Sequence, residues 1–207
     1  MGATDIQVCN LALFHLGVGK RIAALDERGK EAEALNLVYE MARDEMLRTF
    51  AWPFSKRQAA LALVSESGDT DHPTTEYLYS YRYPTDCLMI WKILSEVRND
   101  SRGSRWSYEL AADEQGTLIW TDREDAVMEY ASILARNPAR WQADFVMALS
   151  FRLAAYVAPL LTGGDPFKIG DKSLALWNRS NAQARATAGN EIQQDQEPDS
   201  EFILVRG

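Results

Sequence analysis

Apolar residues recur at helical spacing between residues 30 and 50, with polar residues at most of the positions between them. The apolar set is Leu35, Val38, Tyr39, Ala42, Met46 and Phe50. Positions three and four apart fall on one face of an α-helix, so the pattern predicts a long amphipathic helix with one buried face.

This helix is expected to end at Trp52-Pro53-Phe54. Pro53 disfavours helical geometry at the residue before it and has no backbone N–H to donate. Two aromatic rings beside the proline bring a large apolar area to one corner. They predict a structural corner that packs on the domain core; the alternative is an aromatic box that binds a ligand.

Three other segments have helical character. The first begins after Thr4, a residue that caps helices well, and ends at Gly17. Its inner stripe is Ile6, Cys9, Leu13 and Leu16, with Leu11 and Phe14 beside it. A third helix is expected to open at Asn137-Pro138 and to close at Gly163-Gly164. A fourth follows Asp165 or Asp171 and ends near Gly189.

In the middle of the chain, apolar and polar residues alternate with a period of two. Tyrosines at positions 77, 79, 81 and 83 alternate with smaller or polar residues, which is typical of a strand with one buried face. Further strands are expected within 58–64, 87–97, 105–110, 116–122 and 126–134, separated by polar loops at 65–75 and 99–104. Together they predict a small antiparallel sheet.

These patterns predict a mainly α member of the α+β class: an antiparallel helix bundle with an inserted small antiparallel β region and an extended C-terminal arm. The expected division is 1–64 for the N-terminal helices of the bundle and 65–136 for the β-rich insertion. Residues 137–189 supply the C-terminal helices, and 190–207 the arm.

The arm joins a polar, acidic spacer to four consecutive apolar residues. The apolar residues and the basic residue after them are Phe202, Ile203, Leu204, Val205 and Arg206. A short tail cannot bury such a group by itself. It is expected either to fold back on its own domain or to bind a neighbouring subunit or partner by adding a strand to a sheet.

Composition is that of an ordinary globular chain, with 46% hydrophobic and 25% charged residues. The formal charge of −8 disfavours a broad, non-specific nucleic-acid surface. No secretory signal or membrane span is expected, and the two cysteines, Cys9 and Cys87, are expected to be free thiols in a reducing cytoplasm.

The sequence shows no convincing catalytic, cofactor or metal motif. His15 lies among apolar helix residues and His72 lies in a loop beside Pro73, and neither has a nucleophile at a credible spacing. The acidic group at 122–125 is expected to be a solvated turn, with a cation site as the alternative. Tyr79 and its neighbours with Arg82 are expected to form a sheet face or subunit contact, with nucleic-acid base stacking as the alternative.

One basic group remains, formed by Arg98, Arg102 and Arg105 in a loop rich in Asn, Ser and Gly. Two interpretations are open: a solvated loop, or an interface loop that meets an acidic partner or DNA.

The order of residues over the first 64 positions resembles that of phage head-to-tail adaptor proteins, the group that includes tail tubular protein A. The resemblance is carried by Asn10 to Gly17, Ile22, Leu25, Ala34, Tyr39, Arg43-Asp44 and Trp52 to Phe54. The stretch Tyr81-Arg82-Tyr83-Pro84-Thr85-Asp86-Cys87-Leu88 and the last two helices resemble the group less closely.

This resemblance implies a structural virion protein with no enzymatic activity, located at the head–tail junction after assembly in the host cytoplasm. It would form a homo-oligomeric ring, a 12-mer in that group, whose partners are the portal protein and a tail nozzle or tube protein. DNA would pass through the ring transiently and without specific contacts, and terminal arms would hold the portal. Two alternatives stay open: a cytoplasmic scaffold or binding module, and an unrecognised α+β enzyme.

Overall fold

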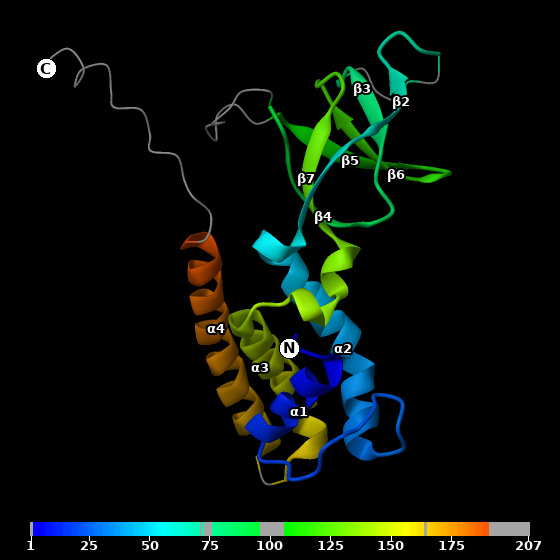
Figure 1. Cartoon of the computed structure of the whole chain (residues 1–207). Coiled ribbons are helices and arrows are strands. Elements are labelled where there is room, and N and C mark those ends of the chain that lie inside the picture. Colours follow the sequence, from blue (N-terminus) through cyan, green and yellow to red (C-terminus); the bar gives the residue numbers. More distant parts are fainter. Residues whose placement is uncertain (1, 71, 73–75, 96–105, 164, 191–207) are drawn as a thin grey trace, which may run out of the picture.

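The computed structural model describes residues 2–70, 72, 76–95, 106–163 and 165–190. Its helices gather at one end of the molecule and its strands at the other, as Figure 1 shows. The helices are α1 (Asp5–His15), α2 (Lys30–Arg48), α3 (Ala143–Leu161) and α4 (Pro166–Asn190). The strands are β1 (Lys56–Ala60), β2 (Ala62–Glu66), β3 (Tyr79–Arg82), β4 (Cys87–Ile93), β5 (Tyr108–Asp113), β6 (Gly116–Thr121) and β7 (Val127–Ser132).

The expected fold class was wrong, because it made the β region a small insertion in a helix bundle. The strands form two antiparallel sheets, in the orders β1-β7-β4 and β2-β3-β6-β5. With 48% helix and 23% strand, the chain is an α+β fold and not a helix bundle with a minor β insertion. The physical reason is that β1 and β2, separated only by Leu61, pair with different sheets.

Because the chain passes from one sheet to the other at Leu61, the β region has a hydrophobic cluster of its own. Its fully buried large residues include Tyr81, Ile119, Met128 and Tyr130. Two sheets around a separate core constitute a second structural half of the molecule, which an insertion of one small sheet would not provide.

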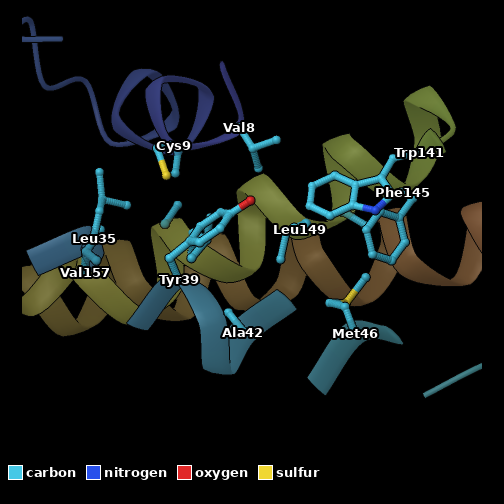
Figure 2. Packing of buried hydrophobic residues seen from close by; sticks show 14 of the residues in the cluster. Val8, Cys9, Leu35, Tyr39, Ala42, Met46, Trp141, Phe145, Leu149 and Val157 are labelled. Carbon is cyan, nitrogen blue, oxygen red and sulfur yellow. The ribbon is translucent and has the colours of Figure 1, made fainter. Parts of the chain in front are cut away.

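The helical half is organised around α3. Helices α1, α2 and α4 all pack on it, and α1 and α2 contact each other only slightly. Figure 2 shows the buried cluster between α1 on one side and α2 on the other, with Cys9 and Val8 facing Leu35, Tyr39 and Ala42 across it.

Helix α3 is long and apolar enough, by length and composition, to cross a membrane, with a mean hydropathy of 1.5 over its most apolar window. Its packing explains that composition. Ala148, Leu149, Leu153 and Ala154 are completely buried against the other three helices.

The expected helix starts are partly confirmed. Thr4 caps α1 in a reciprocal arrangement, in which the Thr4 hydroxyl accepts from the Gln7 N–H and the Gln7 side chain accepts from the Thr4 N–H. Asn137 instead caps a short 3₁₀ turn, Pro138–Arg140, and α3 begins six residues later than its capping signal at Ala143.

Candidate interaction surfaces

The Trp52-Pro53-Phe54 corner is a structural joint between α2 and β1. The Trp52 side chain is completely buried, and its indole N–H donates to the carbonyl oxygen of Met46 at 2.9 Å, within the last turn of α2. The Phe145 ring meets it edge-on at 5.1 Å. A ring so enclosed has no face left for a ligand, so the geometry favours the structural corner over the aromatic box.

Two sets of predicted partner-binding residues lie outside the described part of the chain. These are Arg98, Arg102 and Arg105, and the arm residues Phe202, Ile203, Leu204, Val205 and Arg206. They remain predictions from the sequence.

The histidines have structural partners. His15 Nε2 lies 3.0 Å from the Ser150 hydroxyl, its ring stacks on Phe151 at 4.0 Å, and burial lowers its pKa. His72 bridges the Ser65 hydroxyl and the Tyr77 carbonyl. Within the described ranges, no group of three or more His, Cys, Asp or Glu side chains is arranged to hold a metal ion.

The acidic turn at 122–125 supports the backbone around it. A carboxylate oxygen of Asp122 accepts from the Leu78 N–H at 3.1 Å, and the guanidinium of Arg123 lies over the Trp106 ring. Asp125 has a φ of 49°, a left-handed conformation that Asp tolerates in turns. The structure thus gives this turn a role in connecting β6 to β7.

An ion pair that sequence reasoning missed holds α2, α3 and α4 together. The Arg152 guanidinium donates two hydrogen bonds to the Glu45 carboxylate, at 2.5 and 3.1 Å. It also lies between the rings of Tyr156 and Trp177, at 4.6 and 4.4 Å from their centroids. The available signal was an arginine on the broad apolar face of the third helix, followed by a tyrosine four residues later.

Asp86 has a similar linking role in the β half. Its carboxylate accepts from the Arg57 guanidinium and from the hydroxyls of Tyr130 and Ser132, at 2.9 to 3.1 Å. Burial of the phenol, followed by its contact with Asp86, raises the pKa of Tyr130 to about 12. Asp86 therefore joins β1, β7 and the turn before β4.

A groove opens between α1 and α3, on the side of α1 that faces away from the core. Its volume is about 690 Å³, and its apolar lining is Leu11, Phe14, Val18 and Val146. The Phe14 ring is 74% exposed. The expectation that Phe14 flanks the inner stripe was wrong, because Val8 and Ala12 take the buried positions instead. Gln7, Asn10, Gly19 and Arg21 complete this α1–α3 groove.

Helix α2 carries an exposed apolar ridge, which we call the α2 ridge. It consists of Leu37 and Met41, which are 77% and 56% exposed. Glu33 and Glu40 are exposed on the same side of the helix. The helical spacing of apolar residues predicts the buried stripe of this helix and does not distinguish the ridge.

Two smaller surfaces lie elsewhere. At the end of the helical half, Leu160 of α3 and Phe167 of α4 are exposed beside a pocket of about 200 Å³. In the β half, β2 is the outer strand of its sheet and exposes three consecutive apolar side chains, Ala62, Leu63 and Val64. Unpaired strand edges of this kind accept an added strand.

No protein-family model matches the chain, and the comparison with curated proteins found no match. Support for a function therefore comes from these surfaces and from the residue pattern of the N-terminal segment. Among the described residues, the polar side chains that lie close together form ion pairs and hydrogen bonds that connect helices and strands. The exposed apolar side chains, in contrast, lie on rigid helices and on a strand edge, where they are suited to contact other chains.

Proposed function

We propose that this protein is a structural virion subunit, a head-to-tail adaptor that docks as a ring on the portal and extends the DNA channel toward the tail. One observation carries the proposal: large apolar side chains are exposed on separate sides of the helical half. They are Phe14, Leu37, Met41, Leu160 and Phe167. Exposed apolar side chains on several sides fit a subunit that is covered by several neighbours.

The residue pattern supports an adaptor over other kinds of assembly. The order from Asn10 through Arg43-Asp44 to Trp52-Pro53-Phe54 resembles the N-terminal segment of phage adaptors. In this chain Asn10 ties the loop after α1, since its side chain accepts from the Ile22 N–H and donates to the Ile22 carbonyl, both at 2.9 Å. Asp44 holds Arg136 across the corner, with a shortest contact of 2.6 Å. These matching residues thus support the packing of the helical half.

The partners follow from the same proposal. The arm segment Phe202–Val205 binds the portal, and the β half reaches toward the tail protein. The acidic spacer of the arm, with five carboxylates from Glu191 to Glu201, keeps the apolar segment in water until the portal supplies a surface for it.

The net charge suits a DNA channel. Each copy carries a formal charge of −8, so a ring of about twelve copies carries a large negative charge, and we expect much of it to line the lumen. Like charges on wall and duplex keep passing DNA from binding to the wall. A ring whose lumen proved strongly basic would contradict this part of the proposal.

The decisive experiment is electron microscopy of the purified protein mixed with the portal protein of the same phage, beside a mass measurement of the protein alone. We expect added density beneath the portal, with one copy of this chain per portal subunit. A portal that remains bare, together with a protein that stays a compact monomer, would overturn the proposal.

A truncation tests the arm separately. A chain ending at Glu197 lacks the apolar segment and retains every element between α1 and α4. We expect it to bind the portal at least about 10-fold more weakly, because the arm residues are lost. Unchanged affinity would remove the arm from the proposed interface. The double variant Ile203→Ser, Leu204→Ser at full length is the matched control for chain length.

A further inference from the structure

The α2 ridge and the α1–α3 groove lie on opposite sides of the helical half. The buried residues Val8 and Cys9 point from α1 into the core, and Leu35, Tyr39 and Ala42 point from α2 into it from the other side (Figure 2). On each helix the exposed stripe is turned about half a revolution from the buried one, since residues advance by about 100° each. The two surfaces therefore face away from each other.

Their shapes are complementary. Leu37 and Met41 are four positions apart, so their side chains form a ridge along α2. The groove is built between two helices, with Leu11 and Phe14 on one wall and Val146 on the other. An amphipathic helix that lays apolar side chains spaced four positions apart into a hydrophobic groove is a recurrent mode of recognition between protein chains.

Their charges are also complementary. Glu33 and Glu40 flank the ridge, whereas Arg21 lies on the rim of the groove. The neighbouring Lys20 is already held by Glu31 at 2.7 Å. Within the described part of the chain, Arg21 has no ion-pair partner, so it is available to a carboxylate from another molecule.

We propose that the occupant of the groove is a second copy of this chain: the α2 ridge of one copy packs into the α1–α3 groove of the next, with Glu33 or Glu40 near Arg21. The contact is heterologous because it joins two different surfaces, and surfaces on opposite sides of a subunit propagate the contact into a ring or a filament. This inference rests on the proposed function for the closure of the ring, and it identifies the contact between neighbouring subunits.

Two variants that each block one surface test the contact. Leu37→Glu with Met41→Glu blocks the ridge, and Phe14→Glu blocks the groove. All three side chains are more than half exposed, so the fold should tolerate the changes, and circular dichroism with urea unfolding checks this. Leu110→Glu, on a side chain of β5 that is also more than half exposed, is the matched control.

The measurement is the distribution of molecular mass between about 1 µM and 0.5 mM. We expect the wild-type chain and the Leu110→Glu control to associate increasingly with concentration, and each blocked variant to associate at least about 30-fold more weakly. An equimolar mixture of the ridge and groove variants should form a 1:1 dimer and nothing larger, since each retains one intact surface. The inference is overturned by a wild-type chain that stays monomeric, by blocked variants that associate like the wild type, or by a mixture that does not dimerise.

A charge exchange tests the register. Glu33→Arg with Glu40→Arg should weaken association about 2- to 5-fold, as should Arg21→Glu alone. The chain with all three changes should recover much of the wild-type association. Equal weakening by every combination would show that these charges do not face each other.

The outcome is separable from that of the proposed function. If the wild-type chain and the blocked variants occupy the binding positions on the portal equally well, the adaptor function stands and this contact is wrong. If the mixed variants dimerise but no chain binds the portal, the contact stands and the adaptor function is wrong. A third outcome is that the groove binds a small apolar molecule and not a second copy of the chain, which would overturn the inference. It would be recognised because the molecule binds to the wild-type chain while the distribution of molecular mass stays the same.

Discussion

Arg152 shows how one side chain can decide the packing of three helices. Its guanidinium is mostly enclosed by Glu45, Tyr156 and Trp177. We expect Arg152→Ala to lower the free energy of unfolding by about 3 kcal/mol, because it leaves the Glu45 carboxylate partly buried without its cation and removes a contact with two rings. Urea unfolding followed by circular dichroism measures the change. Arg57→Ala, which removes a more exposed ion pair with Asp86, is the control and should cost clearly less.

Cys9 provides a pH-dependent contribution to stability. Burial of the thiol, and then the nearby Asp5 carboxylate, raise its pKa from 9.0 to about 12. The folded chain therefore holds this proton more tightly than the unfolded chain does. The resulting stabilisation is fully present below pH 9 and is lost progressively as the pH rises from about 9 to about 12.

Urea unfolding measures the free energy of unfolding at each pH. We expect the contribution of Cys9 to this free energy to be nearly the same at pH 7 and pH 8, and the free energy to fall above pH 9. In Cys9→Ala the fall between pH 9 and pH 10 should be smaller, since the tyrosines begin to contribute only above their ordinary pKa of 10.0. Cys87, whose pKa is also raised, contributes in the same direction and remains in both chains. Identical slopes in the two chains would contradict the assignment to Cys9.

Between α2 and β1, the corner is one of the two places where the chain passes between the helical half and the β half; the other is the segment 133–142, between β7 and α3. Trp52 is completely buried, donates to the last turn of α2 and contacts Phe145 of α3. We expect Trp52→Ala to lower the free energy of unfolding by about 4 kcal/mol through loss of buried area and the cavity left behind. Trp52→Phe keeps much of the ring and should cost less. A loss of less than about 1 kcal/mol for Trp52→Ala, measured by urea unfolding, would show that the corner contributes little.

Taken over the whole chain, the charge balance predicts weak attraction to nucleic acid. The chain has 22 Lys and Arg against 30 Asp and Glu, so it offers few phosphate contacts free of competing carboxylates. We expect no binding of a fluorescent 30-bp duplex at about 10 µM protein in 150 mM salt, measured by anisotropy. Binding in the micromolar range at this salt concentration would point to a local basic surface and would contradict a role in which DNA only passes by.

Several local features were predictable because they depend on neighbours in the sequence. The Thr4 cap and the end of α2 before Trp52-Pro53 depend on residues a few positions apart. Asn137 shows where such reasoning fails. Its side chain does cap the next turn, but the Asn-Pro pair does not specify whether a 3₁₀ turn or a long helix follows.

The candidate surfaces were less predictable, for a related reason. Phe14 and Leu37 are both apolar helix residues, and the face that each helix turns toward the rest of the core leaves both of them exposed. The sequence signals an apolar side chain. It does not show which neighbouring helix, from another part of the chain, will cover it.

By itself, the amino-acid sequence determined the helices, the corner, the presence of several strands and the acidic charge of this protein, because these follow from period, capping and composition. Only the tertiary structure decided that β1 and β2 join different sheets, that Arg152 meets Glu45 from 107 positions away, and that the α2 ridge and the α1–α3 groove face opposite directions. Such facts depend on long-range pairing, in which many partners satisfy the same local pattern and the packing of the whole chain selects one.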